Sequence, residues 1–156
     1  MIKITSITVK QDRIVCDVVI EQKSGHQTSP ELLATLLLDF PNLACHTCKN
    51  TEGNTFSAVM DHTSLPHLLE HLVIELQAQT KTSTKVNLPA RSTFQKHMPQ
   101  ISKNKASSRT PFTYLGTSEW LNEQKGRARV EVNFTDDLNA LRAFSDAISI
   151  LNKAMI

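Results

Sequence analysis

Hydrophobic and polar residues alternate in several short stretches of the chain, which is typical of β-strands half buried on a sheet. Two such runs, at residues 2–9 and 13–21, flank a short polar turn and predict a β-hairpin. A third clean alternation covers residues 127–134. We also expect strands at residues 55–60 and 112–121, the second interrupted by a glycine.

Three other stretches carry apolar residues three and four positions apart, which predicts amphipathic helices. They are residues 32–40, which follow the start signal Ser29-Pro30, residues 65–80, and a final helix capped by Thr135 or Asp136. The expected order is therefore β-β-α-β-α-β-β-α. Hairpins joined with helices in this way indicate an α+β fold, with an antiparallel sheet and helices packed on one face in two layers.

Length and composition narrow the class of protein. The 156 residues are enough for a single domain with a hydrophobic core, and we expect one domain over residues 1–156. No apolar run approaches the roughly 20 residues of a membrane span, so no membrane partner is expected. The N-terminal MIKITSITVK lacks the apolar core of a signal peptide, which predicts a cytoplasmic protein with free or metal-bound thiols.

Charge is distributed unevenly. Residues 81–111 contain seven basic residues and no acidic one, so the rest of the chain has a net charge of −5 against +2 for the whole. Because this segment shows no clear periodicity, we interpret it as a basic, solvated insertion loop, or as a surface for an anionic polymer or the rim of a site. Nucleic acid is not the expected partner, because no recognition motif or second basic stripe accompanies the segment.

The predicted helix at residues 65–80 carries the most informative chemistry. His67, Glu70 and His71 fall at i, i+3 and i+4, so they project from one helical face. Two neutral imidazoles one turn apart can bind one zinc ion, and the carboxylate beside them can accept a proton from water. His-x-x-Glu-His is the signature of inverted metallopeptidases, or inverzincins, when it lies on a helix. The alternative is that these are ordinary surface or core histidines.

Three separate motifs follow one another along the chain in an order that is typical of one protein family. Pro41-Asn42-Leu43 precedes His46-Thr47-Cys48, the helix reads His67-x-x-Glu70-His71-x-x-x-Glu75-Leu76-Gln77, and Gly116-Thr117-Ser118-Glu119 precedes a strand at 129–134. Over roughly residues 41–80 and 112–155 the chain thus resembles the N-terminal domain of cyanophycin synthetases. It departs from that pattern at Pro66, where the family has Gly, at Ser118, where it has Arg, and in the longer connection over residues 81–111.

The resemblance implies contact with a polymer of aspartate and arginine and, as in some members of the family, its metal-dependent cutting. Motif and resemblance together favour zinc bound by Cys48, His67 and His71, with Glu70 as general base. Three protein ligands leave the fourth position for water, as catalytic zinc requires. Zinc is expected from the softness of these ligands, with iron, cobalt or nickel as alternatives.

Other residues could support these metal ligands or add a fourth ligand to them. His46 and Glu119 are candidates for substrate contact or support of the ligands, and Glu75 is placed to accept the ring N–H that a metal-bound His71 leaves free. If Cys45 bound the metal as well, the site would be closed and structural. The 18 residues between Cys48 and His67 exceed the roughly 12–15 of a zinc finger.

Three classes of function remain open from the sequence. The first is a zinc-dependent hydrolase of a peptide or amide bond, acting on a peptide-like or polymeric substrate. The second is a non-catalytic domain that binds a polymer or a protein and has a structural or degenerate metal site. The third is a metalloenzyme that is not a hydrolase, because the ligand set also resembles that of S-ribosylhomocysteine lyase. The oligomeric state is open, a homo-oligomer included.

Overall fold

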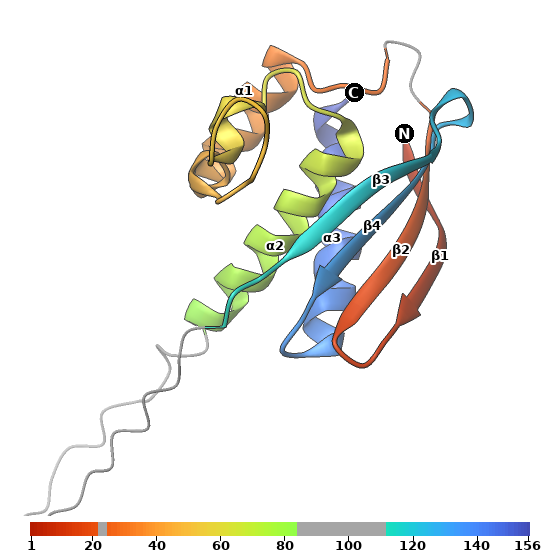
Figure 1. Cartoon of the computed structure of the whole chain (residues 1–156), viewed down its shortest axis with the longest axis vertical. Coiled ribbons are helices and arrows are strands. Elements are labelled where there is room, and N and C mark those ends of the chain that lie inside the picture. Colours follow the sequence, from red (N-terminus) through yellow and green to blue (C-terminus); the bar gives the residue numbers. More distant parts are fainter. Residues whose placement is uncertain (22–24, 84–111) are drawn as a thin grey trace, which may run out of the picture.

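The computed structural model describes residues 1–21, 25–83 and 112–156 and is built around one antiparallel sheet (Figure 1). Four strands lie in the order β1-β2-β4-β3, and their bounds are Ile2–Val9 for β1, Arg13–Ile20 for β2, Arg127–Asn133 for β4 and Gly116–Asn122 for β3. Two long helices, α2 (Leu65–Ser83) and α3 (Asp137–Ala154), cover one face of this sheet. The predicted α+β class, with helices on one face of an antiparallel sheet, is confirmed.

The core lies between the sheet and these two helices. Cys16 of β2 pairs with Val130 of β4, and both side chains are fully buried on the helical side. Alternation along a strand places every second neighbour on the same side. Helix α2 is buried on almost every face, so polar side chains such as Glu70, His71 and Glu75 are buried together with its apolar ones. Its fully buried apolar residues are Leu65, Leu68, Leu69, Leu72 and Val73.

A third helix and two short 3-10 turns form a separate group beside the first half of α2 (Figure 1). Helix α1 (Pro30–Asp39) begins at Ser29, whose hydroxyl accepts a hydrogen bond from the amide of Leu32 at 3.3 Å. It is followed by η1 (Pro41–Cys45) and η2 (Phe56–Ala58). Packing of this group against α2 leaves the first half of α2 between the group and the sheet.

The strand predicted at residues 55–60 is wrong, because this segment forms η2 instead. Phe56 and Val59 are the residues it buries, three positions apart, so its periodicity is that of a helical turn. Phe56 is fully buried and stacks on the ring of His71, with the centroids 4.0 Å apart. One large anchoring side chain, rather than a ladder of strand hydrogen bonds, therefore holds this segment.

The basic segment at residues 81–111 falls almost wholly outside the described residues, and only its first three residues are placed, at the end of α2. The strand predicted at residues 112–121 begins four residues later, at Gly116. Across residues 1–21, 25–83 and 112–156, none of the helices combines the length and the apolar character needed to cross a bilayer.

Replacing Leu72 by Ala tests the buried packing of α2. Its side chain has no solvent exposure, so we expect the free energy of unfolding to fall by about 2–5 kcal/mol in urea denaturation followed by circular dichroism. The control is Leu138→Ala, since Leu138 is 73% exposed and its loss should change stability by less than about 0.5 kcal/mol. Equal effects of the two substitutions would contradict the packing described for α2.

Candidate metal centre

The candidate metal centre is assembled from α2 and from the chain segment between η1 and η2. Cys48 lies in that segment, where its amide donates to the carbonyl of Asn54 at 3.0 Å and the amide of Phe56 donates to the carbonyl of His46 at 2.8 Å. These bonds fold the segment into a narrow loop. The buried ring of Phe56 contacts both histidine rings of α2 and so holds the loop against the helix.

Three possible ligand atoms converge at this contact. The Sγ of Cys48 lies 3.4 Å from the Nε2 of His67, which lies 3.2 Å from the Nε2 of His71. All three atoms lie within 4.8 Å of one another. A tetrahedral zinc ion, with bonds of about 2.0–2.3 Å, holds two nitrogens roughly 3.3 Å apart and a sulfur and a nitrogen roughly 3.6 Å apart. The two separations of 3.4 Å and 3.2 Å are close to these values, so the three side chains form a group that could hold a metal ion.

Cys45 does not join this group in the part of the chain that the structure describes. Its side chain is exposed, whereas Cys48 is 8% exposed. The 3-10 turn η1 ends at Cys45, so the two cysteines leave the backbone in different local conformations. Of the two ligand sets that the sequence leaves open, the geometry agrees with the set of three.

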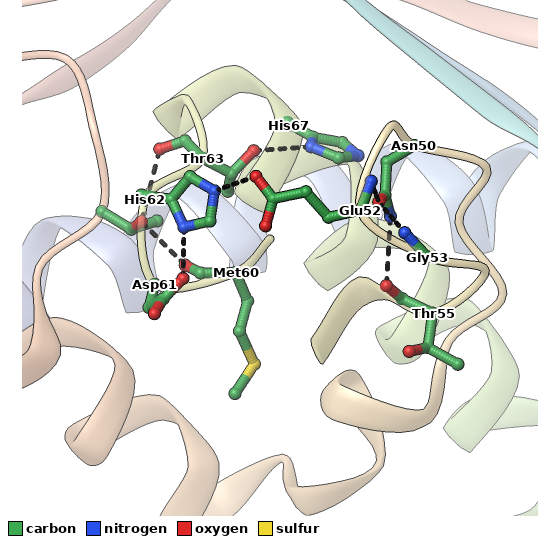
Figure 2. A network of polar contacts seen from close by, with 10 residues as sticks. Asn50, Glu52, Gly53, Thr55, Met60, Asp61, His62, Thr63 and His67 are labelled. Atoms are coloured by element: carbon green, nitrogen blue, oxygen red, sulfur yellow. Dashed lines mark hydrogen bonds and ion pairs between the residues drawn. The ribbon is translucent and has the colours of Figure 1, made fainter. Parts of the chain in front are cut away.

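Each candidate histidine ligand has a hydrogen-bond partner on its other ring nitrogen. The Nδ1 of His67 lies 2.7 Å from the Oγ1 of Thr63 (Figure 2), and the Nδ1 of His71 lies 3.2 Å from the Nδ1 of His46. With both Nε2 atoms directed at a metal, each Nδ1 carries the proton and donates it to its partner. Such partners fix the tautomer and the orientation of a metal-binding ring.

His46 links the centre to a buried carboxylate. Its Nε2 lies 2.8 Å from the Oε2 of Glu75, so a neutral His46 accepts from His71 and donates to Glu75. Glu75 is held in place by the side-chain Nε2 of Gln79, which donates to its Oε1 at 3.0 Å. Glu75 therefore supports His71 through His46 rather than through the direct bond that the helical spacing suggests.

Burial sets the protonation of the two helical histidines. The pKa of His71 is lowered to about 3, first by burial and then by repulsion from His67 and His46. Burial also lowers the pKa of His67. Both rings are therefore neutral near pH 7 and offer a lone pair, which is the form that binds a metal.

Glu70 projects from α2 toward β3. It is 7% exposed, and its Oε2 accepts a hydrogen bond from the hydroxyl of Ser118 at 2.8 Å. Burial raises the pKa of Glu70 to about 7, and the bond from Ser118 opposes this rise. A Cβ atom on Gly116 would lie 2.6 Å from the Cγ of Glu70, so β3 approaches the helix this closely only because a glycine stands there.

One cavity joins these features. It has a volume of about 670 Å³ and contacts three parts of the chain. Its lining includes Cys48 and its two neighbours, the α2 residues His67, Glu70, His71 and Ile74, and residues 114–118 at the start of β3. The candidate base and the three candidate ligands therefore face the same space.

Some site residues differ from the sequence-based expectation. Glu119 lies on the opposite face of the sheet from Ser118, beside Arg129 of β4, and takes no part in the centre. Thr63 and Ser118 were not predicted as partners of the site. The position of Thr63, four residues before His67, is a signal that could have identified it.

A fourth histidine, His62, lies near the centre but belongs to the surface. His62 is bonded to Asp61 and, at 2.9 Å, to the Oε1 of Glu52 (Figure 2). These hydrogen bonds raise the pKa of His62. Because its side chain and both carboxylates are more than half exposed, this cluster is a surface network and offers a control position for the site.

Comparison with known proteins gives one family. The model of the cyanophycin synthase-like N-terminal domain matches residues 13–98, more than half of the chain. The match contains the loop of Cys48 and all of α2, begins before the motif-based range of residues 41–80, and does not include residues 112–155. No curated protein matches the chain. The similarity to inverzincins is not shown by these comparisons.

Thiol labelling tests which cysteine faces the metal. In the metal-free protein we expect a maleimide to modify exposed Cys45 at once and Cys48 slowly, and zinc to protect Cys48 alone. Cys16 should stay unmodified throughout, because it is fully buried and burial raises its pKa to about 12. Mass spectrometry of the digested protein measures each site, and protection of Cys45 equal to that of Cys48 would indicate a closed, four-ligand centre.

Replacing His46 by Ala tests the hydrogen-bonded support of His71. We expect zinc affinity, measured by competition with a chromophoric chelator, to fall by about 10–100-fold because the ring orientation of His71 is no longer fixed. His62→Ala is the control, since the exposed His62 contacts none of the three ligands. Unchanged affinity in the His46 variant, with its fold intact by circular dichroism, would contradict this role.

Proposed function

The chain belongs to the cyanophycin synthase-like N-terminal domain family, which links it to cyanophycin metabolism, and from this membership and its metal-binding group we propose that it is a zinc-dependent hydrolase. The substrate is a peptide or amide bond in a polymer of aspartate and arginine. Cys48, His67 and His71 hold the metal, and Glu70 is the general base.

The observation that carries the proposal is the spacing of the three ligand atoms beside a buried carboxylate in one cavity. Separations of 3.4 Å and 3.2 Å suit a zinc ion, and three ligands leave a position for water. Two imidazoles and one thiolate are ligands that zinc prefers over magnesium or calcium. The support for hydrolysis rather than mere binding is the position of Glu70, which lines the same cavity.

In the proposed reaction, Glu70 transfers the proton and Ser118 positions the carboxylate of Glu70. Zinc, when bound, acidifies a water molecule and polarises the carbonyl oxygen of the substrate. Glu70 takes a proton from water as the water oxygen bonds to the carbonyl carbon. Glu70 then gives this proton to the amide nitrogen as the C–N bond breaks, so one water is consumed and an acid and an amine are released. The hydroxyl of Ser118 orients the carboxylate for both transfers.

The substitution Glu70→Gln separates catalysis from metal binding. We expect the variant to keep one equivalent of zinc, measured by elemental analysis, and to release amines from an aspartate–arginine polymer about 10²–10⁴-fold more slowly. The matched control is Glu52→Gln, which removes an exposed carboxylate outside the cavity and should keep full activity.

Two outcomes would overturn this assignment. Equal turnover by wild type and the Glu70 variant would exclude Glu70 as the base. Binding of the polymer by the zinc-loaded wild type, without cleavage at any pH between 6 and 9, would instead support a non-catalytic polymer-binding domain.

A further inference from the structure

Strand β3 is an edge of the sheet. Its neighbour in the strand order is β4 on one side, and in the described residues no strand lies on the other. Its residues are partly or fully exposed along the whole strand. Figure 1 shows β3 running along one side of α2, the helix that carries Glu70 and both candidate histidine ligands. An open strand edge offers unpaired backbone N–H and C=O groups to another extended chain.

The register shows which groups of β3 are open. The backbone N–H of Asn133 donates to the carbonyl of Leu115 at 3.0 Å, and the N–H of Leu115 donates to the side-chain Oδ1 of Asn133 at 2.8 Å, so these opposite residues face each other as a hydrogen-bonded pair. In an antiparallel ladder the bonded pairs recur every second residue. Thr117 and Glu119 therefore bond to β4 as well, opposite Glu131 and Arg129. Gly116 and Ser118 direct their N–H and C=O groups away from the sheet.

The pairing of β4 with β2, on its other side, also indicates that Gly116 and Ser118 are the open residues of β3. The amide of Phe134 donates to the carbonyl of Asp12, which marks the even-numbered residues of β4 as those bonded to β2. The odd-numbered residues of β4 are then left for β3. Within the described parts of the chain, no backbone partner outside the ladder is present for Gly116 or Ser118.

The two open residues lie at the candidate metal centre. Gly116 and Ser118 both line the cavity that contains Cys48, His67 and His71. Both also contact Glu70: Ser118 through its hydroxyl, and Gly116 through its Cα, which carries no side chain. A chain that paired with Gly116 and Ser118 would thus pass beside the proposed base. No side chain on Gly116 obstructs this approach.

Taking the proposed hydrolase function as the premise, we propose that the free edge of β3 binds the substrate as an extended peptide main chain. The substrate adds to the sheet as a fifth strand, and Gly116 and Ser118 supply its backbone hydrogen bonds. The bond presented to Glu70 then belongs to the main chain of the bound strand. The substrate class is an extended polypeptide of several residues, not a small amide or a side-chain linkage.

A matched pair of variants tests the backbone bonds. Ser118→Pro removes the outward N–H, which an edge strand tolerates because that N–H does not serve the ladder. Ser118→Ala removes only the hydroxyl and keeps the N–H. Each substitution is combined with Glu70→Gln, so that the bound peptide is not cleaved, and the double variants are loaded with zinc. The probe is a linear octapeptide of alternating aspartate and arginine.

We expect the Pro variant to bind this octapeptide about tenfold more weakly than the Ala variant, the effect of one lost hydrogen bond, as measured by isothermal titration calorimetry. Equal affinities of the two folded variants would overturn the edge-strand mode. Octapeptide binding does not require turnover, so a protein that proves not to be a hydrolase can still pass this test.

Hydrogen exchange of the Glu70→Gln protein gives a second test that needs no substitution in β3. The amides of Gly116 and Ser118 should become protected when the octapeptide is bound, whereas those of Thr117 and Glu119 are already protected by β4. Cleavage of the polymer by the wild type without any protection at Gly116 and Ser118 would leave the hydrolase intact and exclude this binding mode.

Discussion

The burial of α2 on almost every face is the constraint on which the centre depends. A helix at a protein surface shows an apolar stripe and a polar face, but α2 carries its polar residues into contact with β3 and with the loop of Cys48. A charge in such surroundings is costly unless it is paired. The histidine rings are therefore held neutral and the carboxyl of Glu70 has a raised pKa, which are the states that ligand and base require.

The loop between η1 and η2 decides whether the three ligand atoms meet. It has little regular structure, and a few specific contacts position it: a bridge between Thr47 and Thr55, the bonds around Cys48, and the ring of Phe56 against α2. The same loop supplies His46, which completes the proton-donating chain from His71 to Glu75. Metal ligation and the fixing of the ligand tautomer therefore depend on one segment.

The family model matches only part of the cavity lining. The candidate ligands, Glu70 and the supporting His46 and Glu75 all lie within residues 13–98. Strand β3, with Gly116 and Ser118, lies outside the match and forms another part of the cavity lining. The candidate ligands and the proposed base thus lie in the part of the chain that the family model matches, whereas Ser118, which orients that base, and the proposed strand-binding edge lie outside it.

The sequence by itself determined the hairpin, the three helices, the α+β class and the shared face of His67, Glu70 and His71, because these depend on spacing between near neighbours. Only the tertiary structure decided that Cys48 rather than Cys45 meets the two rings and that Ser118 reaches Glu70. It also turned Glu119 to the far face of the sheet and made a helical turn of residues 56–58. Local periodicity specifies which side chains share a face, whereas the distant surface that each face meets depends on how the layers pack.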